Sequence, residues 1–219
     1  MASTSTTQSI PTLRSSIIER GYFVSEDLSL GEHVKQMEDN ATPFASASGL
    51  QFAETNVLRH PIIRPLLESL LETSSLGLYR SLGPSPFDYV FNSDPGHEVE
   101  IIMVMIWSPG SKFTCWAGSH RHWLEPIEAA NSLLQVTRAR LQSRGSTPVE
   151  TTFEKGGFAV IDARTAFQIT AGTAITFAFG KEDAAKLWRP MQLPRSLEHH
   201  VTSMESRTLR INVTYAEEG

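Results

Sequence analysis

The sequence has very little cysteine and no long apolar run. Cys115 is the single cysteine among 219 residues, which excludes an internal disulfide framework and a zinc site built from cysteines. The longest apolar run, residues 101–107, is far too short to span a bilayer. The first residues are rich in serine and threonine and lack the apolar region of a secretory signal. We therefore expect a cytoplasmic protein with no membrane partner.

A surplus of positive charge is also missing. The chain has 19 Lys and Arg against 24 Asp and Glu, which gives a net charge of −5. Bulk attraction to nucleic acid or to an anionic membrane is therefore not expected. Hydrophobic residues make up 40 % of the chain, an ordinary globular share, and a chain of this length buries a core without disulfide or metal staples. We expect one domain over residues 1–219.

Several common catalytic signatures are absent as well. The sequence contains no Gly-x-Ser-x-Gly elbow, no phosphate-binding Gly-x-x-x-x-Gly-Lys and no dinucleotide-binding Gly-x-Gly-x-x-Gly. Cys115 lies inside the apolar segment 113–116, where a buried and unreactive thiol is more common than a nucleophile. Asp162 and Arg164 follow the apolar segment 158–161, and we interpret them as a structural ion pair rather than a binding corner.

Hydrophobic periodicity divides the chain into a helical first third and a strand-rich remainder. We expect a disordered tail over residues 1–12, a helical layer over 13–83 and a jelly-roll core over 84–219. The pattern predicts helices over residues 13–19, 29–37, 61–73 and 126–143. It predicts short strands, most of them bounded by Gly or Pro, over residues 89–91, 99–107, 113–116, 149–153, 158–161, 167–170, 175–179 and 209–215. Helices first and strands later favour a mainly β jelly roll, cupin-like, with an N-terminal helical layer.

The histidines are candidate metal ligands, because jelly rolls often carry metal sites. A non-haem iron site uses two histidines and one carboxylate on one face. No histidine of this chain is followed two residues later by Asp or Glu. His97 precedes Glu98 and Glu100, which have the wrong phase to share a strand face with it. His120 and His122 have the right phase for two ligands, although a polar strand end is the favoured interpretation.

Five segments occur in an order that can be compared with known families. Residues 19–28 begin Glu-Arg-Gly-Tyr-Phe-Val, and residues 60–71 begin His-Pro-Ile-Ile and end in Leu-Leu. Val-Met-Ile-Trp at 104–107 is followed by Ala-Gly-Ser-His-Arg-His-Trp at 117–123, and Gly-Gly-Phe-Ala-Val-Ile-Asp-Ala-Arg occupies 156–164. In this order the segments resemble the phytanoyl-CoA dioxygenase-like family of Fe(II)/2-oxoglutarate-dependent oxygenases, with an alanine replacing its turn proline. The resemblance implies a double-stranded β-helix with helices on one side.

The resemblance also implies where a metal site would lie. The metal-binding His and Asp pair should precede the strand at 99–107, where the chain reads Asn92-Ser93-Asp94, so the carboxylate is present but Asn92 replaces the histidine. An amide oxygen is a weak ligand for Fe(II). The second histidine should fall at 165–168, where there is none. The position therefore resembles a degenerate metal site, and we expect no bound cofactor.

Another ligand set remains open if the protein is active. Asp94 would then bind Fe(II) together with His199, His200 or His97. In the oxygenases an arginine about one strand after the second histidine holds 2-oxoglutarate, and Arg210 lies 11 residues after His199. Arg164 is a second candidate for that role.

Three functions are compatible with these features. The first is a non-catalytic supporting subunit of an active oxygenase paralogue, as in fungal biosynthesis of terpenoid, meroterpenoid or polyketide secondary metabolites. Such a pseudoenzyme would form a heterodimer, or else a homodimer, through its helical layer and through Trp116 and Trp123. The second is an active Fe(II)/2-oxoglutarate dioxygenase for hydroxylation or desaturation. The third is a metal-free isomerase or cyclase that uses Asn92, Asp94 and Arg164 on such a small molecule.

Overall fold

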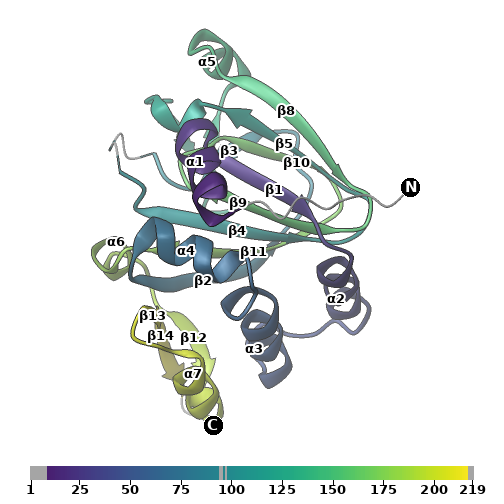
Figure 1. The fold of residues 1–219 in the computed structure, drawn as a ribbon, viewed down its shortest axis with the longest axis vertical. Helices are drawn as coiled ribbons and strands as arrows, with labels where there is room; N and C mark the ends of the chain where they lie inside the picture. The colour runs from purple at the N-terminus through teal and green to yellow at the C-terminus, as the bar shows by residue number, and fades with distance from the viewer. Residues whose placement is uncertain (1–8, 94–95, 97, 217–219) are drawn as a thin grey trace.

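Two sheets of six strands each make up the body of the computed structural model, which describes residues 9–93, 96 and 98–216 (Figure 1). The sheet with the longer strands, called the larger sheet below, has the order β1 (Tyr22–Glu26), β9 (Gly157–Asp162), β4 (Ile101–Trp107), β11 (Ala174–Gly180), β2 (Ser74–Leu82) and β13 (Leu209–Ile211). The smaller has the order β6 (Ile127–Glu128), β7 (Leu134–Val136), β3 (Asp88–Val90), β10 (Phe167–Ala171), β5 (Ser111–Ala117) and β8 (Thr147–Phe153). A separate parallel pair joins β12 (Met191–Pro194) to β14 (Val213–Ala216).

The chain passes repeatedly from one sheet to the other. It crosses from β3 to β4, back to β5, and again between β8, β9, β10 and β11. Neighbouring strands in the two large sheets are antiparallel, except that β13 lies parallel to β2. This topology is a double-stranded β-helix, mainly β with helices added, and the predicted fold class is confirmed.

Strand β4 shows why the core has two parts. Its side chains alternate between the two faces of the larger sheet, and both faces are covered, so all of its seven residues are buried. Met103, Met105 and Trp107 point between the sheets, where Trp107 stacks on Phe153 with ring centroids 5.2 Å apart. The alternate residues, such as Val104, pack against the helices.

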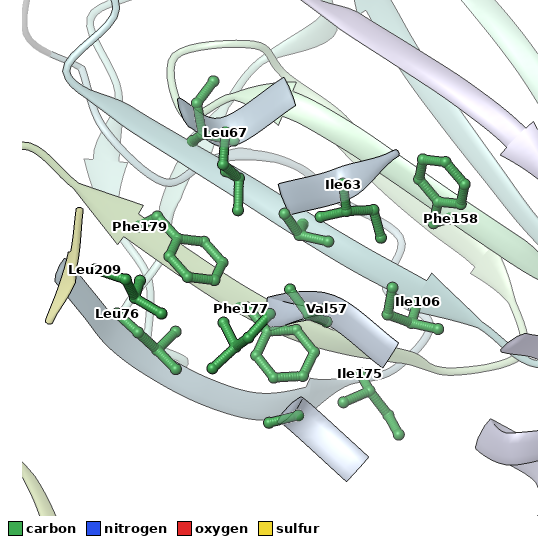
Figure 2. Packing of buried hydrophobic residues seen from close by; sticks show 14 of the residues in the cluster. Val57, Ile63, Leu67, Leu76, Ile106, Phe158, Ile175, Phe177, Phe179 and Leu209 are labelled. Carbon is green, nitrogen blue, oxygen red and sulfur yellow. The ribbon is translucent and has the colours of Figure 1, made fainter. Parts of the chain in front are cut away.

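The N-terminal helices cover the outer face of the larger sheet (Figure 1). In Figure 2, Val57, Ile63 and Leu67 from these helices lie over Phe177 and Phe179 of β11. The helical layer consists of α1 (Ile10–Arg20), α2 (Leu28–Asp39), α3 (Ala47–Ala53), the π-helix η1 (Glu54–Leu58) and α4 (Ile63–Leu71). Among the described residues, no helix is both long and apolar enough to cross a bilayer.

The remaining helical elements are short. They are the 3-10 turns η2 (Ser119–Arg121) and η3 (Arg195–Leu197) and the helices α5 (Arg138–Ser143), α6 (Glu182–Lys186) and α7 (Glu198–Met204).

Three expectations about the elements need correction. The helix predicted over 126–143 is wrong, because the β6–β7 hairpin occupies most of it and only α5 is helical. The stretch 13–83 is not only helical, because it contributes β1 and β2 to the larger sheet. Helix α1 begins at Ile10, inside the tail predicted through residue 12.

Candidate functional site

Residues 165–168, where the second metal-binding histidine was expected, pack in the interior and form hydrogen bonds within the chain. Residues 165–168 are all buried at the start of β10. Phe167 lies in the core between the sheets and packs against Phe113, with ring centroids 6.2 Å apart. The Gln168 amide accepts a hydrogen bond from Arg138 at 2.7 Å. The segment in which the resemblance implies an imidazole therefore contains no histidine, and its side chains serve packing and hydrogen bonding.

Asn92 and Arg164, by contrast, do lie together. Asn92 follows β3 and its backbone N–H donates to the Ala163 carbonyl at 2.9 Å. Arg164 forms a two-pronged ion pair with Asp162, at 2.9 Å from Nε and 2.7 Å from Nη2. Both side chains are almost fully buried, at 9 % and 2 % exposed, so the predicted structural pairing is confirmed. The guanidinium that was a candidate for 2-oxoglutarate already binds a carboxylate of its own chain.

The space beside this pair is very small. Asn92, Asp162 and Arg164 line a cavity of about 10 Å³, which is the size of about one water molecule. An organic substrate for a metal-free reaction does not fit in it. Asp94 and His97, the other candidates near this place, lie outside the described residues.

The end of the roll next to Asn92 is covered. Trp188 follows α6 and meets Phe91 edge to face, with ring centroids 5.7 Å apart. The ring of Trp188 also lies directly against Gly77 of β2, so closely that a Cβ atom there would overlap it. Gly180 at the end of β11 is another neighbour of this ring. Trp188 therefore covers this part of the roll, beside Phe91 and next to Asn92.

The C-terminal candidates lie elsewhere on the molecule. His199 and His200 are exposed on α7, which belongs to the outer layer and contacts α3. Arg210 is exposed on β13 and faces Glu205, with 3.5 Å between Nη1 and Oε2. The structure does not bring these three residues to Asn92 or to the start of β10. Their spacing in the sequence suggested a ligand set that the fold separates.

The described residues do not fit an Fe(II)/2-oxoglutarate centre. They contain no group of three or more His, Cys, Asp or Glu side chains arranged to hold a metal ion. Apolar and aromatic side chains, Phe167 among them, form the core between the sheets. Strand β11 follows β10 in the chain and has the sequence Ala-Ile-Thr-Phe-Ala-Phe-Gly. It carries no arginine that could bind the carboxylate of 2-oxoglutarate.

Two further sequence candidates are structural residues. Cys115 is buried in β5, and burial raises the pKa of its thiol well above the ordinary value, as expected of an unreactive cysteine. His120 is buried in η2, where its Nε2 donates to the Ile18 carbonyl at 3.1 Å, whereas His122 is exposed. The two histidines therefore do not form a ligand pair.

The two candidate interface tryptophans differ. Trp116 is only 3 % exposed, and its Nε1 donates to Asp88 at 2.7 Å, so its prediction as a surface contact is wrong. It lies on the face of β5 that packs against α5 and the neighbouring loop residues rather than on a free surface. Trp123 is 47 % exposed and remains available for contact.

A larger cavity lies at a place that sequence reasoning missed. Its volume is about 370 Å³, and Arg80 is the one charged side chain among the described residues that line it. Tyr89, Leu133, Phe167 and Ile169 form apolar parts of its wall and belong to the core between the sheets. Arg80 lies on the inward face of β2, and a charged residue at such a position indicates a binding site. The sequence pattern did not predict β2, so this position could not be recognised.

Comparison with known proteins identifies the fold. No protein-family model matches the chain, and no curated protein matches it. The solved structure of the epimerase SnoN in complex with Fe3+, alpha ketoglutarate and nogalamycin RO superimposes with a TM-score of 0.58, at 13 % identity, over 78 % of this chain and 83 % of SnoN. The chain has the fold of SnoN.

Two more solved structures agree. A second SnoN structure, described as the non-heme alpha ketoglutarate dependent epimerase from nogalamycin biosynthesis, gives a TM-score of 0.53 at 12 % identity, over 78 % of this chain and 83 % of that chain. AviO1 from Streptomyces viridochromogenes Tue57 gives 0.55 at 10 % identity, over 85 % of this chain and 99 % of that chain. Identities this low establish a common fold, and function has to be argued from the residues of the site.

Proposed function

We propose that this chain is a non-catalytic member of the double-stranded β-helix proteins and acts as the supporting subunit of an active Fe(II)/2-oxoglutarate oxygenase. The observation that carries the proposal is the segment 165–168, which contains no histidine where the resemblance implies one and is buried, with Phe167 in the core between the sheets. The proposal includes the cytoplasmic, fungal secondary-metabolite setting, with terpenoid, meroterpenoid or polyketide substrates bound by the partner. SnoN, which acts in nogalamycin biosynthesis, provides a precedent for this fold in such chemistry.

The packing of the interior supports a structural role. Trp107, Phe113, Phe153 and Phe167 pack together inside the roll, and Trp188 covers one end of it. Such a core stabilises the shell by burying aromatic surface, which is the dominant favourable contribution to folding. A stable shell without a metal centre can still serve a partner by contact.

The contact surface we propose includes Trp123. It follows η2, and η2 contacts the end of α1, where Ile18 is 40 % exposed. Ile127 in the edge strand β6 is 63 % exposed. Exposed aromatic and aliphatic side chains of this kind are typical anchors of protein interfaces. The proposal is a heterodimer; a homodimer would use the same surface with a second copy.

Co-expression with each homologous oxygenase from the same genome tests the proposed function. We expect one of them to co-purify with this chain as a stoichiometric complex and to lose stability and turnover when this chain is omitted. Trp123→Ala should weaken the complex about tenfold or more, as the loss of an interface anchor does. Leu187→Ala is the matched control, because Leu187 is also an exposed apolar residue, at 87 %, and follows α6 directly.

Other outcomes would contradict the proposal. A monomer that binds none of the oxygenases, while each of them is fully active alone, would remove the supporting role. A homodimer that excludes the oxygenases would remove it too. Equal weakening by Trp123→Ala and Leu187→Ala would show that the proposed surface is wrong.

A further inference from the structure

We propose that the cavity beside Arg80 is a binding site for a small organic carboxylate with a compact apolar body. Binding in this cavity requires neither a partner subunit nor a metal, so the proposal goes beyond the supporting role. It rests on the position of Arg80, on the groups that face it and on the shape of the cavity.

Arg80 lies on the inward face of β2. Leu78 and Leu82, two residues away on either side, belong to the core between the sheets, and alternate residues of a strand share a face. In the neighbouring strand Arg80 pairs with Thr176, which is fully buried. The guanidinium thus enters the roll from β2 and reaches the cavity from one side.

The charge of Arg80 is only partly satisfied. Its Nη2 donates to the backbone carbonyl of Asn131 at 2.7 Å. Its Nε is buried and has no hydrogen-bond partner, and no carboxylate of the described residues lies within ion-pair distance. Burial lowers the pKa of Arg80, which reflects the cost of keeping this charge away from water. Since Nε has almost no accessible surface, the donors left for an acceptor in the cavity are those of the terminal Nη groups.

The free donor geometry favours a carboxylate. The two Nη groups of arginine lie in one plane and can donate to both oxygens of a carboxylate. A phosphate carries more charge and is usually held by several cations or backbone amides, whereas Arg80 is the one charged side chain among the described residues of this lining. The site therefore suits an anion with a single negative charge.

The rest of the lining favours an apolar body with one polar contact. Leu82, Leu133, Phe167 and Ile169 supply apolar surface. The Tyr89 hydroxyl is 3.0 Å from the Ser85 hydroxyl, and this pair can exchange a hydrogen bond with a second polar group of the ligand. The volume of about 370 Å³ lies within the usual range of small-molecule sites.

The β6–β7 hairpin provides a cover for the cavity. Asn131 and Leu133, which lie between its two strands, line the cavity together with residues of β2. Asn131 shapes this turn, because its side-chain oxygen accepts from the Leu133 N–H at 3.1 Å and its carbonyl accepts from Arg80. Arg80 therefore holds both the cover and the ligand, and a bound carboxylate would sit beneath the turn.

A titration with cinnamate and its neutral counterpart cinnamamide tests the proposal. The two probes have the same aromatic body and differ in the group that Arg80 would bind. We expect cinnamate to bind and to shift the amide NMR signals of Leu82, Gly83 and Ile169. Cinnamamide and the variant Arg80→Gln should each weaken binding about tenfold or more, as the loss of a charged hydrogen bond does. Arg80→Lys, which keeps the charge and loses the planar pair of Nη groups, should bind with intermediate affinity.

The control variant is Arg59→Gln, which removes an exposed arginine of the helical layer that pairs with Glu54. It should bind cinnamate as the unchanged protein does. Equal affinity for the acid and the amide, or signal shifts outside the cavity, would overturn the proposal, as would no binding of benzoate, cinnamate or 1-naphthoate. If Arg80→Gln does not fold, comparing the affinities of the unchanged protein for cinnamate and cinnamamide still tests the proposal.

Discussion

His60 shows how a single side chain fixes the start of a helix. Its Nδ1 accepts hydrogen bonds from the backbone N–H groups of Ile62 and Ile63, both at 3.2 Å, at the beginning of α4. These amides have no partner inside the helix, so the ring takes the role of a capping oxygen. The ring is buried, and its Nε2 lies 3.5 Å from Asp27. An accepting Nδ1 requires the neutral form of the imidazole.

Stability should therefore fall as the pH is lowered through the range where histidine titrates. Burial lowers the pKa of His60 below 6.5, and its contact with Asp27 only partly opposes this effect. The unfolded chain then binds the proton first, and its relative stability grows as the pH falls below 6.5. Burial lowers the pKa of His120 as well, which adds to the same slope. Urea unfolding at a series of pH values between about 7.5 and 5.5 measures this pH dependence of the free energy of unfolding.

The variant His60→Asn separates the two histidines. The asparagine oxygen can accept from the same amides without titrating, so the decline with falling pH should become shallower. His122→Asn makes the same substitution at an exposed histidine and is the matched control. An unchanged slope in His60→Asn would show that this ring does not contribute.

Residue-level function was only partly predictable from the sequence. The absence of a histidine at 165–168 is visible in the sequence itself, and the ion pair of Asp162 and Arg164 could be predicted from its place after an apolar strand. Arg80 could not be recognised, because an arginine has meaning as a ligand only when its strand and its face are known. His199 and His200 misled for the same reason: spacing along the chain does not determine which layer a helix joins.

At the scale of elements, the predicted strands and the three predicted N-terminal helices are confirmed. The eight predicted segments all contain strands, because continuous apolar runs bounded by Gly or Pro are strong local signals. The helix predicted over 126–143 failed, although its apolar spacing fits a helix. Ser132 has a φ of 59°, which is incompatible with a continuing helix, and Leu133 points into the core between the sheets. Tertiary packing overrides local periodicity here.

Strand β2 shows the opposite error. Its sequence, Ser-Ser-Leu-Gly-Leu-Tyr-Arg-Ser-Leu, contains no β-branched residue and includes a glycine, so its strand propensity is low. Its conformation comes from pairing with β11 on one side and β13 on the other. Such long-range pairing has no signal in the local sequence.

Gly77 in β2 should tolerate no side chain while Trp188 covers it. A Cβ at this position would overlap the Trp188 ring. We expect Gly77→Ala to lower the free energy of unfolding by about 1–3 kcal/mol, the usual cost of overpacking. In the background Trp188→Ala the same change should cost almost nothing, which a double-mutant cycle by urea unfolding measures.

Gly83→Ala is the matched control for this cycle. A Cβ at Gly83 meets no atom within 4 Å, so the change should stay within about 0.5 kcal/mol. If Gly77→Ala lowers the free energy of unfolding equally with and without Trp188, the ring does not pack on Gly77 as described.

At the scale of the whole molecule, the chain keeps the double-stranded β-helix fold. The roll extends over most of the chain, as the superpositions with SnoN and AviO1 show. Phe167 packs in the core between the sheets, and Trp188 packs on Phe91 at the end of the roll next to Asn92. The larger cavity lies beside Arg80. These features support the proposed role through contact and binding.

An anaerobic calorimetric titration with Fe(II) in the presence of 2-oxoglutarate tests the proposed loss of the metal centre. We predict no saturable micromolar binding, and the same result for the variant Asp94→Ala. The control is a titration of an active Fe(II)/2-oxoglutarate oxygenase under the same conditions. Stoichiometric micromolar binding of iron that disappears in Asp94→Ala would contradict the non-catalytic assignment and establish a working metal centre.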